Sequence, residues 1–512
     1  MARFPRPLKV LLNVLAVYAA FFALRGAADR WGAVRLEAGA PLYRHYDIID
    51  IHLETRDPSL LARWRSAPPS AVVLRGGAAV RTVAGIVAVP LAWRAGSRSF
   101  VGRWPCPWNA PDGEYRLALL GEDALRARLR TGAFRVERRK TAPVPRRFAV
   151  LTWESVRPLA TEEVRAPDGT MKDWRGLLDW VQYAGADGFW MLVGQTPGKA
   201  PGELWNTANL DMAPKVAAEC RRRGLKFGVY AENYLTMSSS NLVPGYEYAI
   251  EMEDGKIVST RAVSLRETKR PADVAALLKR FRDIPGVDWL GLDYIRNALG
   301  GYELIDQFFA EMPGVRPPAG WERLSREERV LWFARKKILR KDAAFIDAWQ
   351  WWRAHYVSGI IRRLKAELGD SKPIWAFTLT WERGWQHGQD PVMFCDAGVD
   401  LDALMLYEAT AEQFEYMVKD WSSYLKRSDA PLMVGDIVDQ RLHQNSPRGP
   451  GELFYRLQRA MDRIHPDGPP RGLFVHDLER ALHGRLGGYS TKDWMDQARA
   501  AIKRFKSLPE AP

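Results

Sequence analysis

The sequence predicts an α/β chain that folds as a (β/α)8 TIM barrel, preceded by a small all-β sandwich and an N-terminal export segment. Eight apolar, strand-like runs alternate with amphipathic helical stretches after residue 146. Short β-rich runs with turn residues between them fill residues 41–140. A length of 512 residues exceeds one ordinary core and agrees with two folded domains.

The chain opens with Arg3, Arg6 and Lys9, followed by an apolar run over residues 10–24. This run is shorter than a full membrane span of about twenty residues and suits the core of a signal peptide. Because the small-residue cleavage motifs after it are poor, an uncleaved signal anchor in the inner membrane is the alternative. We assign residues 1–40 to this segment and its linker, and we expect an exported protein of the periplasm or cell envelope.

Residues 41–140 alternate apolar and polar side chains in short runs such as "YDIIDIHLE" and "AGIVAVPLAW". In "NAPDGEYRLAL", a Pro-Asp-Gly turn feeds a strand that begins at Tyr115, as in the tyrosine corner of an immunoglobulin-like sandwich. We therefore predict an immunoglobulin-like domain. This domain either serves as a spacer packed on the barrel or binds sugar through Trp93, Trp104 or Trp108.

Residues 146–505 carry the predicted barrel, with a long insertion over 302–347 after the fourth strand. The predicted strands are 147–154, 186–194, 225–232, 287–295, 372–380, 401–407, 431–438 and 472–478. An open doubly wound sheet is the alternative, but the first strand is followed by "LTWESVRPLA", which contains no glycine for a phosphate loop.

The carboxyl ends of barrel strands meet in one cup, so the residues there are candidates for a site. Six of the eight predicted strands end on a carboxylate, and Trp and Tyr lie among them. Carboxyl pairs and flat aromatic faces are what glycosidic bond cleavage needs. His387, His443 and His476 have no metal-ligand spacing, so we expect neither a metal nor another cofactor.

The segments "VDWLGLDYIRN", "WQWWRAHYVSGIIRRLKAEL", "KPIWAFTL" and "GVDLDALMLYEAT" resemble a family of bacterial glycoside-hydrolase-like TIM-barrel proteins with a GxxLDYxR motif in strand four. The chain is more distantly similar to the α-amylase and α-galactosidase superfamilies. This resemblance implies that Asp293 is a nucleophile supported by Arg296 and Tyr407. At Gly291, two residues before Asp293, the α-amylase clan has an arginine instead.

Glu382 is the candidate acid/base, because the flanking Trp381 and Trp385 make an apolar setting that would keep its carboxyl protonated. An ion pair with a neighbouring arginine is the structural alternative, and Glu408 and Glu232 are alternative acids. Trp190 and Trp205 are stacking candidates that fit a core role equally well. The predicted substrate-binding residues are Trp153, Glu154, Arg296, Trp381, Trp385, Tyr407, Asp436, His476 and Asp477.

These observations predict an exported glycoside hydrolase acting on a polysaccharide or oligosaccharide. The alternatives are a catalytically inactive carbohydrate-binding envelope protein and a sugar deacetylase or lyase on the same fold. The net charge of +14 is scattered rather than gathered in one run, so we expect no nucleic-acid partner. Three cysteines without metal spacing allow at most one disulfide.

Overall fold

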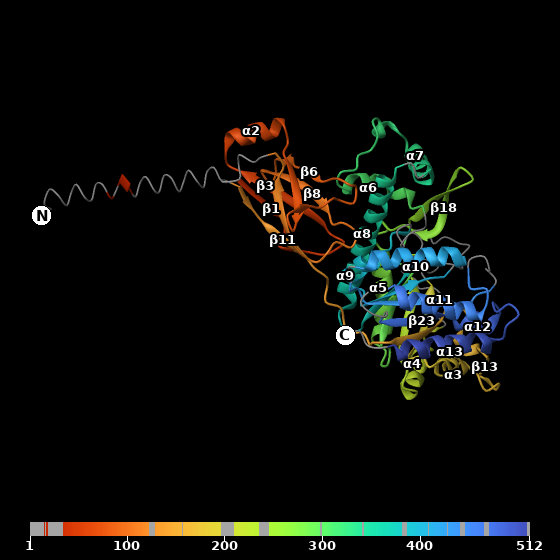
Figure 1. Ribbon diagram of the computed structural model, residues 1–512. Coiled ribbons are helices and arrows are strands. Elements are labelled where there is room, and N and C mark those ends of the chain that lie inside the picture. Colours follow the sequence, from red (N-terminus) through yellow and green to blue (C-terminus); the bar gives the residue numbers. More distant parts are fainter. Residues whose placement is uncertain are drawn as a thin grey trace. The chain divides into compact units, whose positions relative to one another are not determined.

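The computed structural model divides the chain into two compact units. The first comprises Met1–Tyr43 and Asp47–Glu137, and the second comprises Arg44–Tyr46 and Arg138–Pro512. Figure 1 colours the first unit red to orange and the second yellow through blue. The structure describes residues 15, 17–18, 34–121, 129–155, 157–195, 209–234, 245–296, 300–339, 342–380, 387–407, 409–426, 429–440, 446–464 and 471–508.

The N-terminal unit is a sandwich of two β-sheets. Its strands are β1 (Val34–Ala38), β2 (Leu42–Tyr43), β3 (Ile48–Thr55), β4 (Ser70–Arg75), β5 (Ala78–Ala79), β6 (Ala88–Pro90), β7 (Ala92–Arg94), β8 (Ser99–Pro105), β9 (Gly113–Leu119), β10 (Leu129–Thr131) and β11 (Ala133–Val136). One sheet has the order β10-β1-β3-β8-β7, and the other has the order β2-β11-β9-β4-β5 with β6 beside β4. The buried ring of Trp104 on β8 contacts Tyr115 on β9 and Phe134 on β11, which packs the sheets together.

The tyrosine-corner contact predicted for this unit is present, since the Tyr115 hydroxyl donates a hydrogen bond to the Pro111 carbonyl at 2.7 Å. The predicted start of the sandwich at residue 41 is wrong, because β1 begins at Val34 and pairs with β3 along its length. The residues "VRLEA" bury alternate side chains, which is the pattern of a strand with one face in the core. The immunoglobulin-like assignment itself stays a prediction.

The second unit contains a closed barrel of eight strands, each paired in parallel with its neighbours. All eight predicted strands are confirmed. They are β12 (Phe148–Trp153), β15 (Gly188–Gln195), β16 (Lys226–Glu232), β19 (Trp289–Asp293), β20 (Ile374–Leu379), β21 (Leu401–Met405), β22 (Leu432–Ile437) and β23 (Gly472–His476). Their order around the barrel follows the chain, as expected when a helix or loop links each parallel pair.

Helices follow the barrel strands. They are α3 (Arg175–Ala184), α4 (Ala213–Arg222), α5 (Arg270–Arg282), α6 (Ile305–Glu311), α7 (Arg326–Leu339), α8 (Ala343–Leu368), α9 (Pro391–Ala397), α10 (Ala411–Leu425), α11 (Pro450–Arg463), α12 (Leu478–His483) and α13 (Thr491–Ser507). Thr410 and Ser490 begin α10 and α13 with capping boxes. The predicted insertion after strand four holds α6 and α7 (Figure 1), and an unpredicted hairpin, β17 (Tyr248–Glu253) and β18 (Lys256–Val263), follows β16.

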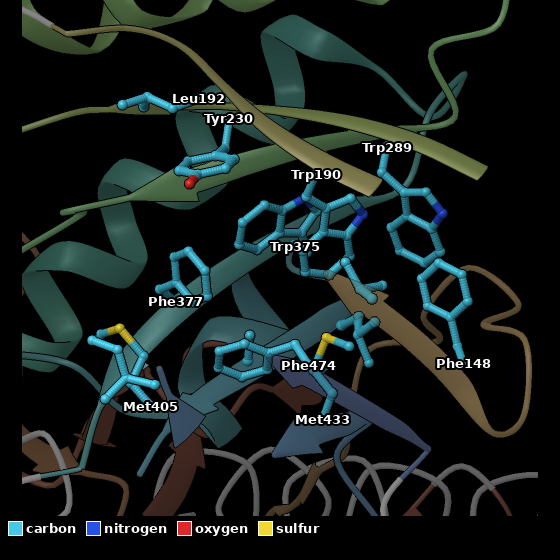
Figure 2. Packing of buried hydrophobic residues seen from close by; sticks show 14 of the residues in the cluster. Phe148, Trp190, Leu192, Tyr230, Trp289, Trp375, Phe377, Met405, Met433 and Phe474 are labelled. Atoms are coloured by element: carbon cyan, nitrogen blue, oxygen red, sulfur yellow. The ribbon is translucent and has the colours of Figure 1, made fainter. Parts of the chain in front are cut away.

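Large aromatic side chains fill the barrel interior. Figure 2 shows the Trp190 and Trp375 rings lying face to face, and their centroids are 3.9 Å apart. Trp289 stacks on Phe148 with centroids 5.7 Å apart. Because Trp190 is fully buried in this cluster, it is a core residue and not the stacking platform considered from the sequence.

The three cysteines are free thiols, and each is buried. Among the described residues, no helix is long and apolar enough to cross a membrane. Most of the predicted export segment over residues 10–24 lies outside the described residues.

Candidate active site

The barrel mouth collects polar side chains from five strands. Interior positions alternate along each strand, and Val150, Tyr230, Trp289, Met405 and Phe474 belong to the interior cluster. Positions an even number of residues further along therefore also face inward. These mouth residues are Glu154, Glu232, Asp293, Tyr407 and His476.

Glu154 is held by cationic and imidazole groups. Its Oε2 lies 3.3 Å from His476 Nε2, and its Oε1 lies 3.8 Å from Arg480 Nη2. The other ring nitrogen of His476 lies 2.8 Å from Thr152 Oγ1, which fixes the orientation of the ring. Burial alone would raise the pKa of Glu154, but the charge and hydrogen bond of His476 and the charge of Arg480 lower it to about 2. Glu154 is thus an ionised carboxylate.

Tyr407 completes this side of the mouth. Its ring stacks on that of His476 with a centroid distance of 5.3 Å and an interplanar angle of 3°. Below it, the Tyr230 hydroxyl donates to the Trp153 carbonyl at 3.2 Å. Burial first, and then the charges of Glu154 and Asp293, raise the pKa of Tyr230. Tyr230 therefore keeps its proton beside these acids.

Asp293 faces a second carboxylate on the neighbouring strand. In the pairing of β16 with β19, Glu232 stands directly opposite Asp293, so their Cα atoms are about 4.8 Å apart as in any such pair. Both are almost fully buried, with 1% and 3% of their surface exposed. Burial, then the charge of Glu154, then that of Glu232 raise the pKa of Asp293 well above its usual value. These surroundings favour the protonated form of Asp293.

The backbone around Asp293 is fixed by hydrogen bonds. Its Oδ1 accepts from the Tyr294 amide at 2.7 Å, and Tyr294 has a left-handed backbone with φ of 46°. The backbone carbonyl of Asp293 accepts from the Asn233 side chain at 2.6 Å and from the Asn233 backbone amide at 2.9 Å. A non-glycine residue with positive φ is uncommon and is found at ligand sites more often than elsewhere.

Arg296 acts on Asp293 through charge and not through direct contact. Its guanidinium lies over the Tyr294 ring, 4.6 Å from the centroid, and its Nη1 is 3.4 Å from His387 Nδ1. Its positive charge opposes the rise in the pKa of Asp293. Within the described part of the chain, Arg296 and Asp293 form no ion pair within 4.0 Å.

Two predicted substrate-binding residues, Trp153 and Asp436, point away from the mouth. Trp153 is fully buried and packs edge-on against His483 on α12. Asp436 faces α11, where Arg456 Nη1 lies 3.9 Å from its Oδ2. Both are one residue out of phase with the interior positions, and a shift of one residue reverses the face of a strand. Asp477 caps α12 by accepting from the Arg480 amide, and its Oδ2 also accepts from the Glu154 amide at 3.0 Å.

Four predicted residues, Trp381, Glu382, Trp385 and Glu408, lie outside the described residues, as does the stacking candidate Trp205. The sequence reading missed Thr152, Tyr230 and Arg480. The period of two would have found Thr152 and Tyr230, which precede Glu154 and Glu232 by two residues. The helical spacing of three from Asp477 would have indicated Arg480.

Two cavities lined by described residues lie outside the barrel mouth. One, of about 790 Å³, is lined by residues of the insertion such as Trp332 and Lys336. The other belongs to the N-terminal sandwich. Among the described residues, no group of three or more His, Cys, Asp or Glu side chains is arranged to hold a metal ion.

Fold and mouth together define a (β/α)8 barrel with two carboxyl groups, Glu154 and Asp293, whose pKa values are shifted in opposite directions. The chain matches no family model and no curated protein sequence. It is similar to solved structures at low identity, and we take this as a likeness of fold that assigns no activity.

One is an exo-β-1,4-mannosidase, Op5Man5, from Opitutaceae bacterium strain TAV5, at 11% identity and a TM-score of 0.38, over 71% of this chain and 61% of that chain. A chitinase from Bacteroides thetaiotaomicron has 9% identity and a TM-score of 0.38, over 71% of this chain and 98% of that one. Endo-glycoceramidase II from Rhodococcus sp. has 13% identity and a TM-score of 0.38, over 69% and 78%. The match thus spans less than two thirds of the mannosidase.

Proposed function

We propose that the protein hydrolyses glycosidic bonds of an oligosaccharide or polysaccharide at the mouth of the barrel. The observation that carries this proposal is the opposite displacement of two carboxyl pKa values in one mouth, Glu154 downward and Asp293 upward. Two carboxyls whose surroundings drive their pKa values apart are the requirement for combined acid and base or nucleophile chemistry.

In this proposal Asp293 donates its proton to the leaving glycosidic oxygen, and Glu154 is the ionised carboxylate that stabilises or attacks the anomeric carbon. The C–O bond to the leaving sugar breaks as the proton of Asp293 arrives on that oxygen, and water then forms the new C–O bond and returns a proton to Asp293. The raised pKa of Asp293 favours this role over the nucleophile role that the family resemblance implies. Tyr407 and His476 lie beside Glu154 and would contact the sugar.

Asp293→Asn tests the proton-donor role on a panel of polysaccharides and on nitrophenyl glycosides, with release of reducing ends as the measurement. We expect a loss of about 10²- to 10⁴-fold on unactivated substrates. The loss should be much smaller on nitrophenyl glycosides, because their leaving group needs no proton. The matched control is Asp436→Asn, a buried aspartate on another barrel strand that faces the helices, and the activity of this variant should be unchanged.

Equal losses on both kinds of substrate would assign Asp293 as the nucleophile and overturn the donor role. If the wild-type protein released no sugar from any substrate but bound glycans, the carbohydrate-binding alternative would replace hydrolysis. Release of acetate would support the deacetylase instead.

We also propose that the chain is exported through residues 10–24 and stays in the periplasm or cell envelope. The observation behind this is the sequence of three cations before an apolar run. A fusion of residues 1–40 to a reporter that is active only outside the cytoplasm would be active if the proposal is correct and inactive if it is wrong.

A further inference from the structure

The N-terminal sandwich has a basic groove at one end of its five-stranded sheet. At this end β3 ends and β1 and β10 begin. Residues of the turn between β7 and β8 and of the helix α2 (Pro58–Ser66) also line the groove. The groove encloses about 1180 Å³, which exceeds the roughly 300–1,000 Å³ of pockets for single small molecules. Five of its lining side chains are arginines, namely Arg35, Arg56, Arg65, Arg98 and Arg130.

The pairing of the strands gathers these cations. Arg35 on β1 stands opposite Arg130 on β10, and it stands opposite Glu54 on β3 in the other direction. Glu54 is the single acidic residue among the lining side chains. Arg98 lies in the tight turn before β8 with φ of 49°, a left-handed conformation that favours glycine or asparagine over arginine. The groove therefore has an excess of positive charge.

Most of this charge is uncompensated within the described part of the chain. Arg35 pairs with Glu37 at 3.3 Å, but Arg56, Arg98 and Arg130 form no ion pair with any described carboxylate. All five arginines are exposed to solvent. Exposed guanidinium groups without a partner are free to bind anions, and their planar fork matches a carboxylate in a bidentate geometry.

Trp93 in the groove is not a free stacking platform. The Arg65 guanidinium covers its ring at 4.3 Å from the centroid, and Phe100 packs against it at 5.1 Å. A neutral sugar would therefore find no open aromatic face there, whereas an anionic sugar would find charge.

We propose that this groove binds an acidic polysaccharide, a glycan chain that carries carboxylate groups. The length of the lining from β10 to the β7–β8 turn suits an extended polymer, and exposed arginines along a groove suit a chain better than the flat surface of a membrane. Without further free aromatic rings, the groove lacks the stacking surfaces that single-stranded nucleic acid uses. This site is separate from the barrel mouth and does not depend on hydrolysis there.

The test measures binding of the full chain to immobilised polygalacturonate, with neutral dextran, vesicles containing phosphatidylglycerol and single-stranded polynucleotide as comparison ligands. The test variant is Arg98→Gln/Arg130→Gln. The matched control is Arg81→Gln/Arg116→Gln, which removes the same charge from exposed positions of the same sandwich outside the groove. Unfolding temperatures of all three proteins confirm that the variants are folded.

We expect binding to polygalacturonate and not to dextran, and a loss of about tenfold or more in the groove variant, since each charge-assisted hydrogen bond contributes substantially. The control should change by less than about twofold, because exposed charges away from a contact contribute little. An equal loss of polygalacturonate binding in both variants would mean that binding depends only on the net charge of the protein, and it would overturn the proposal.

No binding of polygalacturonate would also overturn it, as would groove-dependent binding of vesicles or polynucleotide alone. Asp293→Asn should bind like the wild type, so a failure of the hydrolase proposal is distinguishable from a failure of this one.

Discussion

Replacing Asp436 by asparagine is expected to stabilise the protein at neutral pH and to change little near pH 4. The carboxyl is 1% exposed, and its Oδ1 accepts from the Ile437 amide at 2.8 Å. Burial first, opposed by the charge of Arg456, raises its pKa from 3.8 to about 7. A difference of roughly three pKa units corresponds to about 4 kcal/mol, which is the cost of ionising this group in the folded chain.

The sign of the effect follows from proton binding. Below about pH 4 both the folded and the unfolded chain hold the proton, so the group has no effect on stability. As the pH rises from 4 to 7, the unfolded chain loses the proton while folded Asp436 keeps it, and stability falls. Above pH 7 the cost is constant. Asparagine keeps the shape and the acceptor for Ile437 but never ionises.

The measurement is urea unfolding followed by tryptophan fluorescence, for wild type and Asp436→Asn, at intervals from pH 4 to pH 8. The difference in the free energy of unfolding should grow by up to about 4 kcal/mol, with about half of the growth between pH 5 and pH 7. Other titrating groups cancel because both proteins share them. Asp429→Asn is the control for removal of a carboxylate, since this side chain is 77% exposed and pairs with Arg138 at the surface. A difference that is independent of pH would refute the raised pKa.

Three further predictions follow from contacts in both units. Gly291→Ala would place a Cβ 2.4 Å from the ring of Trp375. Calorimetry should therefore show a loss of about 1–3 kcal/mol or more in the free energy of unfolding, and a variant as stable as the wild type would contradict this packing. Tyr115→Phe removes a buried hydrogen bond and should cost about 1 kcal/mol in chemical unfolding, while no loss would exclude the tyrosine corner. Arg296→Met removes the charge that lowers the pKa of Asp293, so the basic limb of the kcat/KM profile should move to higher pH, and a downward shift would contradict this.

The barrel could be predicted from sequence because its strands are buried on both faces and read as continuous apolar runs between helices. Every predicted strand is present, and no predicted bound differs from the observed one by more than two residues. Gly291 also has a physical reason that the sequence could not supply. Trp375 and Tyr230 fill the space beside it, so no side chain fits at the position where the α-amylase clan has an arginine.

The site was predicted less well, because a list of strand ends ignores which face each residue occupies. Glu154 and His476 face the mouth, whereas Trp153 and Asp436 face the helices. In a strand this parity decides whether a residue lies in the site or in the packing layer. A continuous apolar run hides the parity, since both faces are buried. To tell from the sequence which strand-end residues face the mouth, one would have to know the first inward-facing residue of each strand.

Protonation states were beyond the sequence for a different reason, since each depends on charges from other strands. Arg480 on α12 and His476 on β23 keep Glu154 ionised, and the charge of Glu154 is itself a cause of the raised pKa of Asp293. The two states are therefore linked, because whatever keeps Glu154 charged also helps to keep Asp293 protonated. An exchange of Arg480 would act on both carboxyls at once, although it lies outside the mouth. In this mouth the assignment of acid and base depends on residues from β12, β19, β23 and α12 together, and no single strand motif carries it.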